Sequence, residues 1–228
     1  MKKYYPIFLD LAEKTCLVVG AGTLATSKAE QLLEAGAQVH LVGPELHARL
    51  QSRQESGRLI WHQRPFQDSD LDQAFLTFVI SADVVLNQHI FQTAEAQGKL
   101  VNVVDVMDEA NFIMPAVASA GPVQVAVSTS GTSPVLAKGL RDQIREHFID
   151  SEVGLLAEYL GNWRTQVKAR LPTYESRRLF WERVFTSEAP VLVKNGKPAQ
   201  ADKILTELLA FSESSEPGSE LPLQTAVC

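Results

Sequence analysis

One stretch decides the fold: Cys16-Leu17-Val18-Val19-Gly20-Ala21-Gly22-Thr23-Leu24-Ala25, where an apolar run ends in a G-x-G-x-x-A turn and a helical pattern follows. Gly20 allows a sharp turn at the end of a strand, and Gly22 leaves room for backbone to approach a pyrophosphate. Ala25 is small enough for the helix to pack close to the strand. The first N–H groups of that helix would face the phosphates. The order of these features predicts a dinucleotide-binding unit; a purely structural tight turn is the alternative.

The first 110 or so residues alternate strand and helix patterns. The expected strands are 15–19, 38–42, 59–63, 75–80 and 100–104. The expected helices are 27–35, 45–56 and 84–97. Strands that alternate with helices indicate βαβ units and a parallel sheet. The uninterrupted apolar run at 75–80 is typical of a strand covered on both faces. The predicted class is therefore α/β, with a Rossmann-like parallel sheet domain over residues 1–110.

The pattern changes after Asp105. Residues 111–133 are rich in small residues, with a β-like piece at 123–128, and Ser133-Pro134 has the form of a helix start. Apolar residues then recur every fourth position along one helical stripe, at Leu136, Leu140, Ile144 and Phe148. We expect 111–150 to be a small α+β dimerisation segment, because it is too small to form its own core and should bury against a second copy.

The remaining residues divide into two parts. Residues 151–211 read as a helical domain with an interruption near Leu171-Pro172. Residues 212–228 are rich in Ser, Glu and Pro and are expected to form a disordered tail.

Composition excludes several classes of function. The net charge of −6 and the pI near 5.4 argue against nucleic-acid binding through overall charge. No run reaches about 18 apolar residues, so no membrane partner is expected. Asp10 and Glu13 interrupt the apolar run behind the basic start, which does not read as a signal peptide. The two cysteines lie at opposite ends, and the five histidines show no metal-ligand spacing. We expect a cytoplasmic protein without a resident metal.

Three features could carry chemistry. Asp105 follows the fifth strand and should face the crevice beyond the strand ends, although a turn or cap role is the alternative. The hydroxyl-rich segment 127–134 runs into a helix start and could present N–H groups and hydroxyls to an anion, or serve as a helix cap or dimer contact. Residues 164–183 hold six basic side chains against two acidic ones. That excess would suit a polyanionic substrate or simply a solvated helix face.

Several segments together resemble the precorrin-2 dehydrogenase/sirohydrochlorin ferrochelatase family, the siroheme synthase module. The resemblance runs from about residue 4 to 185, and its segments are Pro6-Ile7-Phe8, Val18–Ala25 with Lys28-Ala29, Leu33–Ala37, Asn102–Asp105, Asn111–Pro115, Val125–Ala137 and Arg177–Glu182. The F-I-M-P and S-x-x-G-T-S-P segments are far more specific than the glycine turn. Their order and spacing make chance similarity a poor explanation.

The resemblance implies NAD-dependent oxidation of precorrin-2 to sirohydrochlorin and, in many members, insertion of ferrous iron as a substrate to give siroheme. It implies a homodimer whose active site lies between the nucleotide domain and the segments after Asp105. It also implies that Asp105 is the acid/base group of both reactions. The implied cofactor-binding positions are Gly20, Gly22, Thr23, Leu24, Ala25, Pro44, Glu45, Ser81 and Asp83. The implied substrate-binding positions are Ser128, Thr129, Gly131, Thr132 and Ser133.

The chain departs from the family pattern at three places. Thr129 stands where some members carry a serine that is phosphorylated, and Ser81-Ala82-Asp83 stands where Thr-Asp-Asp is common. Glu45 lies slightly beyond the usual position of the acid that holds the ribose. No Lys or Arg occupies 43–46, which favours NAD over NADP.

Two other functions stay open at this point. One is a dehydrogenase without chelatase activity, which the sequence does not separate from the bifunctional enzyme. The other is a nucleotide-sensing regulatory module, which would need neither Asp105 nor the segment 111–137.

Overall fold

The computed structural model describes residues 2–214 and divides the chain into two compact units. One unit comprises Met1–Met114 and Ser130–Thr132, and the other comprises Pro115–Thr129 and Ser133–Cys228. The finer division into 1–110, 111–150 and 151–211 stays a prediction. The expected disorder of 212–228 is wrong for residues 212–214, which are helical, and the rest of that tail lies outside the described residues.

The described part of the first unit contains a five-stranded parallel sheet with the strand order β3-β2-β1-β4-β5. Its strands are β1 (Thr15–Gly20), β2 (Gln38–Val42), β3 (Leu59–His62), β4 (Leu76–Ile80) and β5 (Leu100–Val103). Strands β2 and β3 lie on one side of β1 in the sheet, and β4 and β5 lie on its other side. The predicted Rossmann-like class is therefore confirmed, and the carboxyl ends of β1 and β4 flank the point where the strand order reverses.

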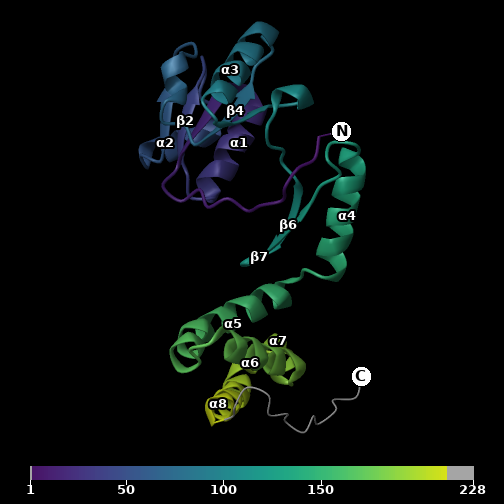
Figure 1. Ribbon diagram of the computed structural model, residues 1–228. Helices are drawn as coiled ribbons and strands as arrows, with labels where there is room; N and C mark the ends of the chain where they lie inside the picture. The colour runs from purple at the N-terminus through teal and green to yellow at the C-terminus, as the bar shows by residue number, and fades with distance from the viewer. Residues whose placement is uncertain (1, 215–228) are drawn as a thin grey trace. The chain divides into compact units, whose positions relative to one another are not determined.

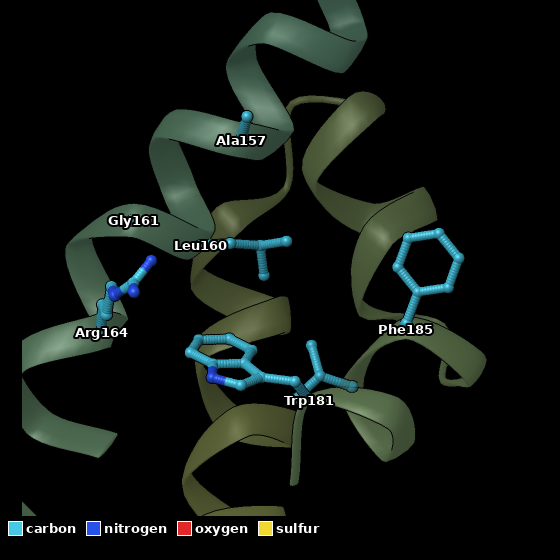
Figure 2. Close-up of a pocket in the computed structure, with 7 residues that line it drawn as sticks. Ala157, Leu160, Gly161, Arg164, Trp181 and Phe185 are labelled. Atoms are coloured by element: carbon cyan, nitrogen blue, oxygen red, sulfur yellow. The ribbon is translucent and has the colours of Figure 1, made fainter. Parts of the chain in front are cut away.

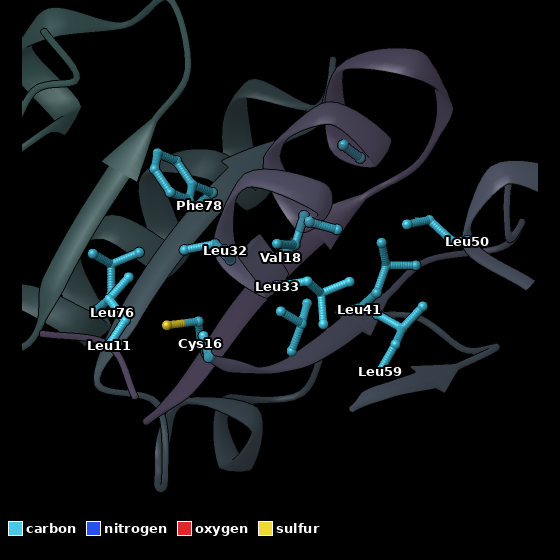
Figure 3. Close-up of a cluster of buried hydrophobic side chains, with 14 residues drawn as sticks. Leu11, Cys16, Val18, Leu32, Leu33, Leu41, Leu50, Leu59, Leu76 and Phe78 are labelled. Atoms are coloured by element: carbon cyan, nitrogen blue, oxygen red, sulfur yellow. The ribbon is translucent and has the colours of Figure 1, made fainter. Parts of the chain in front are cut away.

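Helices cover both faces of this sheet (Figure 1). They are α1 (Gly22–Glu34), α2 (Ala48–Glu55) and α3 (Val84–Ala96). Alternate residues of β1 point to opposite faces, so Cys16 and Val18 join the core beneath α1 and α2, while Leu17 and Val19 join the core beneath α3. Figure 3 shows the first of these cores. Burial on both faces explains why these strands are continuous apolar runs.

Two helix starts differ from the predictions. Helix α1 begins at Gly22 rather than at residue 27, because its first turns pack on the sheet through the buried residues Ala25 and Thr26. Helix α2 begins at Ala48 rather than at residue 45, because the His47 ring accepts the N–H of Arg49 and caps the helix there. Glu45 therefore lies in a loop after β2 and not in a helix.

In the described part of the second unit, an antiparallel pair of strands packs against the long helix α4 (Pro134–His147). The strands are β6 (Ala116–Ala120) and β7 (Val123–Val127). The sequence pattern predicted β7 but missed β6, since β6 is a run of small residues of which only Ala118 is buried. The predicted helix start is confirmed, because the Ser133 hydroxyl accepts the N–H of Leu136.

The same unit continues into helices around a separate apolar core. They are α5 (Ser151–Arg170), α6 (Tyr174–Thr186), α7 (Ala189–Lys194) and α8 (Pro198–Ser214). Phe180, Leu205 and Leu209 are fully buried at its centre. The interruption near Leu171 is confirmed, since it separates α5 from α6. None of the helices within residues 2–214 is both long and apolar enough to cross a membrane.

Gly20 generates a prediction about stability. Its φ is +137°, and a Cβ there would overlap the carbonyl oxygen of Ile80 at the end of β4. Gly20→Ala should lower the free energy of unfolding by about 2–4 kcal/mol, through backbone overlap and strain at positive φ. Urea denaturation measures this difference. Gly57→Ala is the matched control, since Gly57 has φ +75° but open space around a Cβ. Equal losses in the two variants would show that the close contact with β4 is unimportant.

Candidate active site

The start of α1 has no side-chain cap. Its N-cap residue Ala21 makes no side-chain hydrogen bond, and the first turn contains no acidic residue. By contrast, α3 to α6 are capped by side chains, from Asp83, Ser133, Asp150 and Thr173. The free N–H groups and the positive end of the α1 dipole therefore stay available.

The geometry of the glycine turn fits a pyrophosphate. Apart from the adjoining residues and the backbone of α1 itself, no atom of residues 2–214 lies within 4 Å of the place where a Cβ of Gly22 would be, so the backbone there faces open space. Thr23 and Leu24 are exposed beside it, whereas Ala25 is buried against the sheet. Close packing by Ala25 is thus observed, while close approach of a pyrophosphate at Gly22 stays a prediction.

The end of β2 forms the next part of this edge. Pro44 and Glu45 are both exposed, and the loop is held by hydrogen bonds from Trp61 Nε1 to the Gly43 carbonyl (3.1 Å) and from Gln63 Nε2 to the Pro44 carbonyl (3.3 Å). The Glu45 carboxylate is thus on an anchored loop beside the strand that carries the glycine turn. It could accept hydrogen bonds from ribose hydroxyls.

Asp83 has a structural role that the sequence analysis missed. Its Oδ1 accepts the N–H groups of Val85 and Leu86, at 3.0 Å each, and so caps α3. Ser81 is also engaged, because its Oγ accepts the Asp83 N–H and its carbonyl accepts the Asn87 side-chain amide. The signal was present in the sequence, since an Asp directly before a helical pattern is a common N-cap.

Asp105 lies just beyond β5, at the same edge of the sheet. Its φ is +67°, an uncommon value that Asp tolerates better than most residues. The backbone on either side is held by hydrogen bonds from Val104 N to Val79 O and from Val106 N to Val103 O. The carboxylate is exposed and accepts no hydrogen bond from residues 2–214, so it caps nothing there. An unbonded carboxylate at a strand end suits proton transfer.

The loop after Asp105 is clamped from two sides. The Lys2 ammonium donates to the carbonyls of Met107, Asp108 and Ala110, at 3.0, 3.3 and 3.1 Å, around the short helix η2 (Met107–Glu109). From the other side, the Asn102 amide donates to the Phe112 carbonyl (2.8 Å). Nothing in the local sequence indicates the Lys2 contact, because it joins residues more than a hundred positions apart.

The hydroxyl loop is divided between the two units. Thr129 Oγ1 donates to the Ser133 carbonyl (3.0 Å) and accepts the Ser133 N–H (3.1 Å), so this hydroxyl fixes the start of α4. Ser128 and Thr132 are exposed on either side of the turn. Gly131, with φ +82°, belongs to the first unit, and a Cβ there would overlap the thioether end of Met107. Thr129 and Ser133 therefore stabilise the start of α4, as the helix-cap interpretation of this segment predicted.

Most of the basic run over 164–183 is engaged with other groups of the helices, largely on their exposed surface. Arg170 pairs with Glu213, Arg178 pairs with Glu175 and Glu182, and Arg177 donates to the carbonyls of Leu171 and Pro172. These contacts favour the structural interpretation of the run. Arg164 is different, since it lines an open, mostly apolar groove of about 420 Å³ between α5 and α6 with Leu160, Trp181 and Phe185 (Figure 2).

Comparison with known proteins agrees with this geometry. Residues 7–116 match a family described as "Putative NAD(P)-binding", residues 120–147 match "Sirohaem biosynthesis protein central" and residues 152–209 match "Sirohaem synthase dimerisation region". A siroheme synthase of Photorhabdus laumondii is 41% identical over 92% of the chain. The chain is thus similar to siroheme synthases along nearly its whole length. A second siroheme synthase, from Neisseria meningitidis serogroup C, is 41% identical over 90% of the chain.

The chain spans less than half of these siroheme synthases, 44% and 43% of their lengths. A solved structure titled "SirC, precorrin-2 dehydrogenase" matches with a TM-score of 0.71 at 23% identity. That match covers 88% of this chain and all of the other, so the two share a fold. Within residues 2–214, no three His, Cys, Asp or Glu side chains are grouped as a metal site would require.

Gly22 generates a prediction about the cofactor. Gly22→Val should weaken NAD binding at least about tenfold, or roughly 1.4 kcal/mol, because a side chain there fills the space that a pyrophosphate needs. Titration calorimetry with NAD measures the change. Gly57→Val is the matched control, since Gly57 also has positive φ and open space but lies on another loop. Unchanged NAD affinity in Gly22→Val would show that the pyrophosphate does not bind at this turn.

Proposed function

We propose that this chain oxidises precorrin-2 to sirohydrochlorin with NAD and then inserts ferrous iron to give siroheme. The observation that carries the proposal is the pairing of two features at one sheet edge. An uncapped helix start with open space at Gly22 suits the cofactor, and an unbonded carboxylate at Asp105 suits proton transfer. Similarity to siroheme synthases supports the choice of substrate.

Bound NAD would supply a hydride acceptor for the oxidation of the macrocycle. The carboxylate of Asp105 would accept the proton that the ring loses in the same oxidation. Because Asp105 is exposed, it can pass that proton to water and return to the ionised form. The same carboxylate could then accept pyrrole N–H protons one after another as ferrous iron, a substrate, enters the ring. The positive φ and the clamped loop would hold the carboxylate in place during both steps.

NAD suits this site better than NADP. Residues 43–46 contain no cation that could bind a 2′-phosphate, and the nearby Arg49 is paired with Glu30 at 2.7 Å. Glu45, which is exposed on the loop after β2, would instead repel a phosphate and accept ribose hydroxyls. The proposed cofactor contacts are Gly20, Gly22, Thr23, Leu24, Ala25, Pro44, Glu45, Ser81 and Asp83.

The substrate contacts follow from the resemblance. They are Ser128, Thr129, Gly131, Thr132 and Ser133, in a loop whose N–H groups and hydroxyls suit carboxylate side chains of a tetrapyrrole. Since Thr129 is already bonded to Ser133, we propose that it acts mainly by shaping this loop. A cytoplasmic location and the three-part division 1–110, 111–150 and 151–211 belong to the same proposal.

We propose a homodimer as the working assembly. The segment 111–150 exposes a series of apolar side chains, Val117, Val135, Leu136, Leu140 and Phe148. Residues 152–209 match the family region named for dimerisation, and that region also exposes Leu155 and Phe185. Exposed apolar surface of this kind is typical of an interface, so both regions are proposed to contribute.

Asp105→Asn tests the proposed chemistry. The variant keeps the shape of the side chain and removes the proton acceptor, so dehydrogenase turnover should fall by about 10²–10⁴-fold with NAD affinity unchanged. The assay mixes protein, precorrin-2 and NAD and follows the absorbance of NADH. A second stage adds ferrous iron to sirohydrochlorin and follows siroheme.

Asp108→Asn is the matched control, because Asp108 is another exposed carboxylate on the following turn. Turnover within a few-fold of wild type in Asp105→Asn would place the base elsewhere. Loss of precorrin-2 oxidation alone, with iron insertion unchanged, would show that the two reactions do not share Asp105. A wild-type protein that binds NAD but turns over neither substrate would favour the nucleotide-sensing alternative.

Light scattering tests the assembly. The expected mass is twice the 25.1 kDa of the chain at micromolar concentration. Leu136→Lys should shift the mass toward one chain, because it places a charge on an apolar side chain that is 54% exposed in the single chain. Lys138→Gln, on the same helix, should leave the mass unchanged. A wild-type mass of one chain would refute the dimer.

A further inference from the structure

Lys28 stands out among the cations of the first unit. Among its described residues, Lys28, Arg64 and Lys99 are the half-buried ones. Arg64 forms a double hydrogen bond with Asp70, and Lys99 donates to the carbonyls of Leu71, Asp72 and Ala74. Lys28 has no hydrogen bond or ion pair with any residue in 2–214. A half-buried charge usually has a hydrogen-bond or ion-pair partner, because removing a charge from water without such a partner costs free energy.

The surroundings of Lys28 place it near the predicted chemistry. It lies on α1, two positions after the buried Thr26, and its Nζ lies 5.3 Å from the centre of the Phe78 ring. Phe112, from the F-I-M-P segment, packs edge-on against Phe78 with the ring centres 5.3 Å apart. The Lys28 ammonium therefore lies over the Phe78 ring of β4, and that ring in turn contacts the segment that follows the Asp105 loop.

The charge next to Lys28 is Asp105. Burial lowers the pKa of the Lys28 ammonium, and the Coulomb attraction of Asp105 acts in the opposite direction. The two groups are close enough to interact yet are not within ion-pair distance, since no bridge of 4.0 Å or less joins them. The ammonium thus interacts electrostatically with the proposed acid/base group and donates no hydrogen bond to any residue in 2–214.

We propose that Lys28 binds a carboxylate side chain of the tetrapyrrole and thereby holds the ring against Asp105. The inference rests on the proposed function, because it takes the substrate to be a tetrapyrrole with several carboxylates. A carboxylate on Lys28 would give the half-buried ammonium a charged partner. The half-buried Phe112, which packs edge-on against the buried Phe78, would offer apolar surface to the adjoining ring atoms.

Binding of sirohydrochlorin, measured by its own absorbance and fluorescence, tests Lys28 apart from catalysis. Lys28→Gln should raise the Kd for sirohydrochlorin by about 10- to 100-fold, as expected when a charged hydrogen-bond partner is lost. Lys28→Arg should stay within several-fold of wild type, because the charge is kept. NAD affinity should not change in either variant. In the turnover assay, Lys28→Gln should raise KM for precorrin-2 with kcat within a few-fold of wild type.

Lys14→Gln is the matched control. The Lys14 ammonium also lies over an aromatic ring, Phe75, at 5.9 Å, but Lys14 precedes β1 and so lies at the amino edge of the sheet. Its removal should leave the Kd unchanged. Melting temperatures close to wild type would show that the variants fold.

Two outcomes would overturn the assignment of Lys28. One is an unchanged Kd for sirohydrochlorin in Lys28→Gln. The other is a fall in kcat with a shifted pH profile but unchanged Kd and KM, which would mean that Lys28 acts on Asp105 and not on substrate. Failure of the proposed function looks different: a wild-type protein that binds sirohydrochlorin but oxidises no precorrin-2 leaves the Kd comparison intact. A wild-type protein that binds no sirohydrochlorin would overturn both.

Discussion

The close approach of the Gly20 backbone to the Ile80 carbonyl is the contact on which the rest of the site depends. It lies where β1 and β4 end side by side, at the reversal of the strand order. Because no Cβ intervenes, the chain can turn at once from β1 into α1. The first N–H groups of α1 then open onto the same edge as the ends of β2, β4 and β5. A larger residue at Gly20 would move α1 away from this edge. The N–H groups of α1 would then no longer face the same space as the residues at the ends of the neighbouring strands.

The polar side chains at that edge fall into two groups: those that form hydrogen bonds within the protein, and those that remain exposed and could contact a ligand. Asp83 is occupied in capping α3, while Asp105 and Glu45 stand exposed on loops that other residues anchor. The Lys2 clamp and the Asn102 amide hold the backbone around Asp105 without touching its carboxylate. This arrangement separates the groups that keep the loops in place from the groups that could meet a ligand, which is what precise positioning of a reactive group requires.

The second unit shows the opposite balance. Several basic side chains of its helices, among them Arg170, Arg177 and Arg178, pair with neighbouring carboxylates or carbonyls, and apolar side chains are exposed along α4. Exposed apolar area of this kind is typical of a surface that meets another protein. The match to a family region named for dimerisation lies within helices α5 to α8.

Local pattern determined the strands, the glycine turn and the family resemblance. Continuous apolar runs and the motif segments are properties of neighbouring residues, so Leu17, Gly20 and Asp105 could be placed from sequence. The helix starts could not, because the caps at Ala21 and His47 depend on backbone geometry and a ring nitrogen. Nor could β6, whose small residues carry little β signal. Only the tertiary structure decided which polar groups are engaged. The Lys2 clamp on the Met107 loop and the contact of Lys28 with the Phe78 ring join residues far apart in the chain, and such contacts leave no periodicity in the sequence.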